Sequence, residues 1–108
     1  MTDAAKEFRT VGKSDEVPEK YVMPYYLEDR KHRVSVARID NRLYAFDDLS
    51  TSDHAPLSSG LLTGTTIMSQ CDGSRFDVIT GRVVNGPAKE PIGTYEAREL
   101  NGEVQIRI

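Results

Sequence analysis

Cysteine, histidine and tryptophan are nearly absent from this chain of 108 residues, which has one cysteine, two histidines and no tryptophan. A single cysteine excludes an intramolecular disulfide, and an unpaired thiol is typical of the reducing cytoplasm, where we expect this protein. No apolar run approaches the roughly 18 residues of a membrane-spanning helix. The charged start, MTDAAKEFRTVGKSDE, lacks the apolar segment of a signal peptide. With a formal charge of −3 and no basic stripe, nucleic acid and membrane are not expected partners.

The remaining composition, 38% hydrophobic and 29% charged, describes one ordinary globular domain with a single modest core. Helical periodicity is absent except near Thr2 to Glu7, and turn residues recur at short intervals. Arg33 to Ile39 alternates apolar and polar residues, which predicts a strand with one face on a core. Two hairpins are expected, one at Asp40-Asn41 and one at Asn101-Gly102. These features predict a small antiparallel β-sandwich or barrel.

Three single residues have structural interpretations that need no functional site. Pro24 cannot donate a ladder hydrogen bond, so its strand is expected at a sheet edge. Phe76 lies in an apolar–polar alternation and is predicted to be a core residue. His32 lies in the charged turn Asp29-Arg30-Lys31-His32-Arg33, where we expect it to be solvated and without a role.

The stretch from Asp47 to Ala88 carries a series of short motifs in a fixed order. They are Ala55-Pro56-Leu57-Ser58 with Gly60, Gly73-Ser74-Arg75-Phe76-Asp77, Thr80-Gly81-Arg82-Val83 and Gly86-Pro87-Ala88. The series resembles the cluster-binding half of a Rieske-type [2Fe–2S] ferredoxin, the electron-carrier component of aromatic-ring dioxygenases. The resemblance implies one Rieske-like domain at residues 1–108. A cluster-type subdomain of residues about 47–84 would be inserted into a base of residues about 1–46 and 85–108.

In this family a Cys-x-His loop and a Cys-x-x-His loop supply two thiolates and two imidazoles to the cluster. With the flanking motifs aligned, the four cofactor-binding positions fall on Ser50, Ser52, Ser69 and Asp72. All four are substituted, and hydroxyls do not replace thiolate ligands in iron–sulfur clusters. We therefore expect these positions not to hold a [2Fe–2S] cluster, and we predict no cofactor.

A shifted register does not restore the ligand set. Cys71 and His54 lie in the same loops, but using them breaks the match at Gly73 to Phe76 and supplies only one thiol and one imidazole. A mononuclear metal site at Asp53, His54, Cys71 and Asp72 is a further possibility, because zinc accepts mixed donors. Nothing in the spacing favours that metal site, so these residues are interpreted as polar loop residues.

Two functions remain open. The first is an accessory or binding subunit of an oxygenase or reductase system, with a protein partner from that system. The alternative is an electron-transfer Rieske ferredoxin of a ring-hydroxylating dioxygenase or a nitrite reductase-like system, with ligands altered in this chain. An enzyme in its own right would need a nucleophile beside a base, and His54 is the only imidazole near Cys71. Without a supporting acid–base pair, we predict that the chain is not an enzyme.

Overall fold

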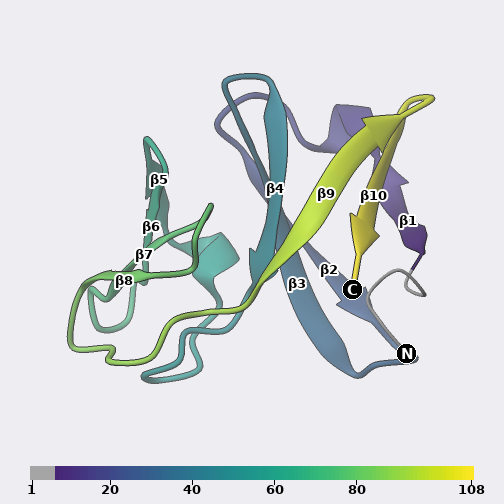
Figure 1. The fold of residues 1–108 in the computed structure, drawn as a ribbon. Helices are drawn as coiled ribbons and strands as arrows, with labels where there is room; N and C mark the ends of the chain where they lie inside the picture. Colours follow the sequence, from purple (N-terminus) through teal and green to yellow (C-terminus); the bar gives the residue numbers. More distant parts are fainter. Residues whose placement is uncertain (1–6) are drawn as a thin grey trace.

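A computed structural model describes residues 7–108, and its strands confirm the predicted all-β fold (Figure 1). The helical stretch predicted near Thr2 to Glu7 lies, except for Glu7, outside the described residues. The strands are β1 (Phe8–Lys13), β2 (Val22–Leu27), β3 (His32–Ile39), β4 (Arg42–Asp47), β5 (Leu61–Thr63), β6 (Thr66–Met68), β7 (Arg75–Asp77), β8 (Val83–Asn85), β9 (Thr94–Leu100) and β10 (Glu103–Arg107). Two short 3₁₀ helices are η2 (Ser14–Glu16) and η3 (Leu57–Ser59).

The larger sheet has six antiparallel strands in the order β1-β10-β9-β4-β3-β2 and nearly closes into a barrel. Its two edges are tied together by side chains. Arg9 of β1 donates to both carboxylate oxygens of Asp29, just beyond β2, at 3.0 and 2.7 Å. Tyr25 of β2 donates its hydroxyl proton to Glu16 at 3.1 Å. Pro24 lies in β2 at the sheet edge, as predicted.

Both predicted hairpins are present, and their turns have the backbone that tight hairpins need. Asp40 and Asn41 have φ of 52° and 66° between β3 and β4, and Asn101 and Gly102 have φ of 52° and 78° between β9 and β10. Two consecutive positive φ angles define the type I′ turn, whose twist matches that of the flanking strands. The sequence signals for these turns are local, and both predictions are confirmed.

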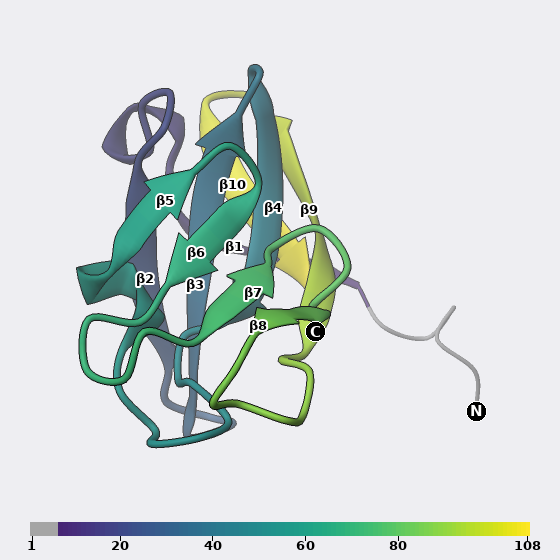
Figure 2. The same ribbon diagram turned by 90° about the vertical axis from the view of Figure 1, so that its left-hand side faces the viewer.

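The smaller sheet, in the order β5-β6-β7-β8, packs against the outer side of β3 and β4 (Figure 2). Phe76 and Ile67 from this sheet share a buried cluster with Ala37 and Phe46 of the larger sheet. On the other face of β3, Val36 belongs to a second cluster inside the six-stranded sheet. The alternation predicted one face of β3 on a core, and the structure buries both faces, while the core position of Phe76 is confirmed.

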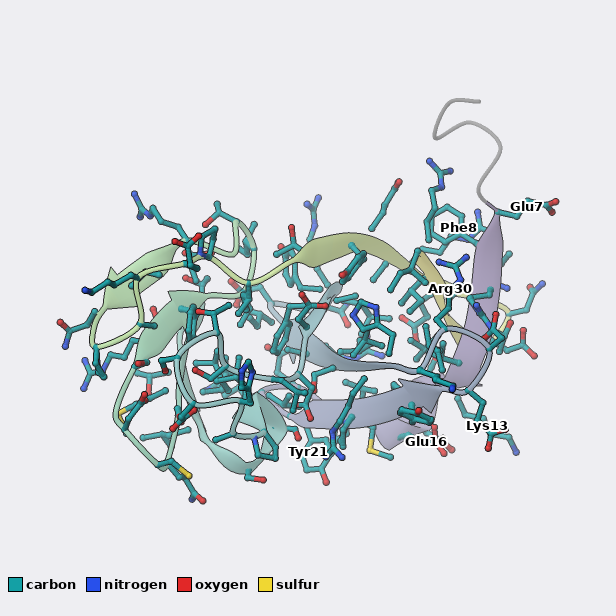
Figure 3. The ribbon with its side chains drawn as sticks, turned by 90° about the horizontal axis from the view of Figure 1, so that it is seen from below. Glu7, Phe8, Lys13, Glu16, Tyr21 and Arg30 are labelled. Carbon is teal, nitrogen blue, oxygen red and sulfur yellow. The ribbon has the colours of Figure 1, made fainter. Side chains whose placement is uncertain are left out.

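The edge strand β1 and the small sheet lie on opposite sides of the molecule (Figure 1). Figure 3 shows Phe8, Lys13 and Glu16 at the end of the six-stranded sheet that lies away from the small sheet. The loops before β5, between β6 and β7 and after β8 lie along the lower edge of the small sheet in Figure 2. Residues 7–108 contain no helix of the length and apolar character that crossing a bilayer requires.

Candidate functional site

Three loops of the small-sheet region meet through hydrogen bonds and form the candidate site, here called the tip. They are residues 49–56 after β4, residues 69–74 between β6 and β7, and residues 86–88 after β8. The second loop is closed at its base, because the Ser69 amide donates to the Ser74 carbonyl at 2.8 Å. The third loop joins the second, since the Ala88 amide donates to the Ser74 hydroxyl oxygen at 2.9 Å.

The first loop is fixed at its start by Asp48, a carboxylate with a fully buried side chain. Its oxygens accept hydrogen bonds from the Ser35 hydroxyl at 2.7 Å, from the Ser58 amide at 2.8 Å and from the Arg33 guanidinium. Burial alone would raise the pKa of Asp48, but the bonds from Ser35, Arg33 and Ser58 outweigh it and hold that pKa below its usual value. Asp48 is therefore charged at neutral pH and connects β3, the first loop and η3.

Ser52 is the centre of a side-chain network between the first and second loops. Its hydroxyl donates to Asp72 Oδ2 at 2.5 Å and lies 2.9 Å from the Ser50 hydroxyl and 3.3 Å from the Ser74 hydroxyl. Because Asp72 only accepts, the Ser50 and Ser74 protons are free to point toward the Ser52 oxygen. The network thus has one consistent direction of donation, ending on the Asp72 carboxylate.

The Asp72 carboxylate accepts bonds from both sides of the tip. The Ser52 hydroxyl lowers its pKa most, followed by the Ser74 amide, which donates to Oδ1 at 2.9 Å. Both donors favour the ionised form, so the network is complete when Asp72 is charged. Chemically, this arrangement fastens two loops together with one anion and three hydroxyls.

The structure brings three of the four sequence-predicted positions, Ser50, Ser52 and Asp72, into direct side-chain contact. Ser69 is buried nearby, but its hydroxyl oxygen accepts only the Cys71 amide, at 3.3 Å. Ser69 joins the other positions through its backbone bond to Ser74. The residue that sequence reasoning undervalued is therefore Ser74, which touches all three loops.

The possible mononuclear metal donors are not gathered. Asp53 accepts the Ala55 amide at 3.0 Å within its own loop, while His54 and Cys71 are exposed. Within residues 7–108, no three His, Cys, Asp or Glu side chains are arranged to hold a metal ion. The interpretation of Asp53, His54 and Cys71 as polar loop residues stays a prediction.

His32 was predicted to be solvated and without a role, but the structure places it half-buried in a side-chain cluster. His32 Nε2 lies 2.5 Å from Asp47 Oδ1, and the same oxygen accepts the Tyr95 hydroxyl at 2.8 Å. The Gly93 amide donates to the other carboxylate oxygen at 3.0 Å. Burial and the adjacent Asp47 carboxylate raise the pKa of Tyr95, so this phenol stays protonated. This cluster connects β3, β4 and β9 below the tip and is structural.

In the loop Gly86-Pro87-Ala88, the Ala88 side chain is buried in the core between the two sheets. Replacing Ser74 with alanine is expected to leave the Ala88 amide without its acceptor, at a cost of about 1–3 kcal/mol in free energy of unfolding. Urea unfolding measures the loss, and hydrogen exchange at the Ala88 amide should become faster. Ser59→Ala, at an exposed serine outside the tip, is the control and should change neither.

A near-barrel that carries a small second sheet with interconnected tip loops defines an all-β class of two-sheet domains. The model of one family, the Rieske [2Fe-2S] domain, matches residues 7–96. This chain therefore belongs to the Rieske [2Fe-2S] domain family.

The relatives are ferredoxins of dioxygenase systems. The ferredoxin component of the naphthalene 1,2-dioxygenase system of Pseudomonas aeruginosa is 32% identical over 91 residues, covering 84% of this chain and 86% of that protein. The structure of a ferredoxin from Sphingomonas yanoikuyae B1 matches with a TM-score of 0.87 and 26% identity, over 94% of this chain and 99% of the other. A chain in the complex of reduced oxygenase and oxidized ferredoxin in carbazole 1,9a-dioxygenase matches with a TM-score of 0.84 and 26% identity, over 93% and 92%.

These matches confirm the Rieske-type fold and the likeness to dioxygenase ferredoxins. The relatives are ferredoxins or ferredoxin components of such systems, in agreement with the prediction that this chain is a component of an oxidoreductase system and not itself an enzyme. The prediction of no cofactor is contradicted, because the family that matches 7–96 is a [2Fe-2S] family. The side chains at the tip nevertheless do not fit the two thiolates and two imidazoles of a Rieske centre, since one exposed cysteine and one exposed histidine are the only such groups there.

Proposed function

We propose that this Rieske-family protein acts as a binding or accessory subunit of a dioxygenase system. In this proposal Ser50, Ser52, Ser69 and Asp72 occupy the four ligand positions of the family. The observation that carries it is the hydrogen bond from Ser52 to Asp72. This bond joins the first and second loops of the tip through side chains that are neither thiols nor imidazoles. A tip closed in this way keeps its shape as a docking surface.

The proposed partner is the oxygenase component of the system. In the carbazole 1,9a-dioxygenase complex, a relative of similar fold is associated with an oxygenase. We propose that residues about 47–84 form the partner-facing subdomain and that the base of residues about 1–46 and 85–108 supports it. The cytoplasm is the proposed compartment, because the exposed thiol of Cys71 needs a reducing environment to stay free.

The test pairs two measurements on the full chain. Binding to each terminal oxygenase component that the organism encodes is measured by calorimetry, and stimulation of electron flow from the reductase to that oxygenase is measured with the same samples. We expect a one-to-one complex without stimulation. The matched variant carries Ser50→Cys, Ser52→His, Ser69→Cys and Asp72→His, and is expected to gain iron and acid-labile sulfide over the unchanged chain.

Each outcome bears on a separate part of the proposal. If no oxygenase component binds, the partner is wrong. If the unchanged chain stimulates electron flow, the function is electron transfer and the accessory role is wrong. Equal iron and sulfide in the two proteins would mean that the four named residues are not at the ligand positions.

A further inference from the structure

The small sheet has apolar side chains on both of its faces, although only one face is covered by the larger sheet. Leu62, Ile67, Phe76 and Val83 point toward the core between the sheets. Because side chains alternate along a strand, their neighbours point outward. The outward set encloses a shallow hollow of about 270 Å³, lined by Leu61, Thr63, Thr66, Met68, Arg75 and Val84.

The outer face is uncovered in the described part of the chain, as Figure 2 shows for the sheet nearest the viewer. Leu61 is 58% exposed and Val84 is 49% exposed, high values for strand residues of this type. The strand register aligns Leu61 with Met68 and Met68 with Arg75, so the three side chains form one row across β5, β6 and β7. Contiguous exposed apolar side chains on one face of a sheet favour an interaction surface, and here Leu61, Met68 and Val84 line the same hollow.

Arg75 gives this row its charge. Within residues 7–108 its guanidinium makes no hydrogen bond or ion pair, and no carboxylate lines the hollow. A partner that covers the row therefore needs a carboxylate opposite Arg75 and apolar side chains around it. A two-fold contact whose axis runs along the row would set the two Arg75 side chains against each other, so that arrangement of a second copy is disfavoured.

The row is continuous with the tip. Met68 directly precedes Ser69, and Arg75 directly follows Ser74, the two residues whose backbone bond closes the second loop. A protein that binds the tip and extends along β6 and β7 would therefore meet the row. Resting on the proposed function, we propose that the oxygenase component docks across the tip and the outer face of the small sheet, with a carboxylate of the oxygenase against Arg75 and apolar side chains against Leu61 and Val84.

The test measures the affinity of full-length variants for the oxygenase component by calorimetry. Arg75→Glu, Leu61→Lys and Val84→Lys are each expected to weaken binding about tenfold or more, as central interface residues do. Since all three side chains are exposed, their melting temperatures should stay near that of the unchanged chain. Arg30→Glu and Leu100→Lys are the matched controls at exposed positions outside the small sheet, and they should bind as the unchanged chain does.

The outcomes separate this inference from the proposed function. If the unchanged chain binds no oxygenase component, the proposed function fails and the inference fails with it. If the unchanged chain binds but the three variants bind equally well, only the docking surface is wrong. A concentration-dependent dimer in sedimentation that Leu61→Lys abolishes would assign the face to a second copy, which would also overturn the inference.

Discussion

Replacing Phe76 with alanine is expected to lower the free energy of unfolding by about 3–5 kcal/mol, a large share of the stability of a domain of this size. The ring is fully buried between the two sheets, in contact with a cluster that includes Ile67 and Phe46. Its strand, β7, is paired on both sides by β6 and β8, so the backbone has little freedom to collapse into the cavity.

Urea unfolding followed by circular dichroism measures this loss. The control is Tyr26→Ala, which removes an aromatic side chain that is 59% exposed on β2, the edge strand of the six-stranded sheet. This substitution should change the free energy of unfolding by about 0.5 kcal/mol or less. Because the cluster inside the six-stranded sheet does not include Phe76, amide exchange should accelerate more in β6 and β7 than in β10. A loss below about 1 kcal/mol would mean that the small sheet does not depend on this core.

The parts of the fold that were predictable from sequence are those with local causes. The turn at Asn101-Gly102 needs two consecutive positive φ angles, and glycine and asparagine adopt them at low cost. The burial of both faces of β3 had no such signal. Ala37 and Ile39 are covered by the small sheet, whose strands begin only at Leu61, so this burial depends on how separate segments pack.

At the candidate site, too, the features with local causes were predictable from sequence and those that depend on distant contacts were not. Flanking motifs predicted that both loops belong to one site, and the structure joins Ser52 to Asp72 across 20 positions of sequence. The direction of the hydrogen bonds and the central role of Ser74 depend on rotamers that no spacing reveals. His32 was misjudged for a related reason: its neighbours in sequence are charged and exposed, whereas its partners Asp47 and Tyr95 are 15 and 63 positions away.

The prediction about the cofactor failed in a different way. That prediction considered only the residue types at four positions. The family that matches residues 7–96 is defined by its [2Fe-2S] cofactor. The donor chemistry at a few positions and the membership of a family are separate kinds of evidence about a cofactor. For this chain the side chains do not fit the cluster, whereas the family is a [2Fe-2S] family. The four-position variant under the proposed function measures how much those positions matter to iron content.

Replacing Asp48 with alanine is expected to cost about 3 kcal/mol, because two donors lose their acceptor at a cost of about 1–3 kcal/mol each. The two donors are the Ser35 hydroxyl, which is fully buried, and the Ser58 amide. The exposed part of Arg33 regains water, so its charge adds little to the loss. Urea unfolding at neutral pH measures the effect, and Asp15→Ala, at an exposed aspartate outside the tip, is the control.

The charge of Asp48 also predicts how stability depends on pH. Its pKa is lower in the folded chain than in the unfolded one, where an aspartate has a pKa of about 3.9. The folded state therefore binds this proton less readily, and the contribution of Asp48 is complete above about pH 5 and declines as the pH falls through the folded pKa.

In Asp48→Asn this titration is gone while the other carboxylates remain. The stability difference between the unchanged chain and Asp48→Asn should shrink between about pH 6 and about pH 3. A difference that stays constant over that range would mean that the Asp48 carboxylate is not stabilised by its charge, and that Ser35, Arg33 and Ser58 hold the first loop equally well around a neutral side chain.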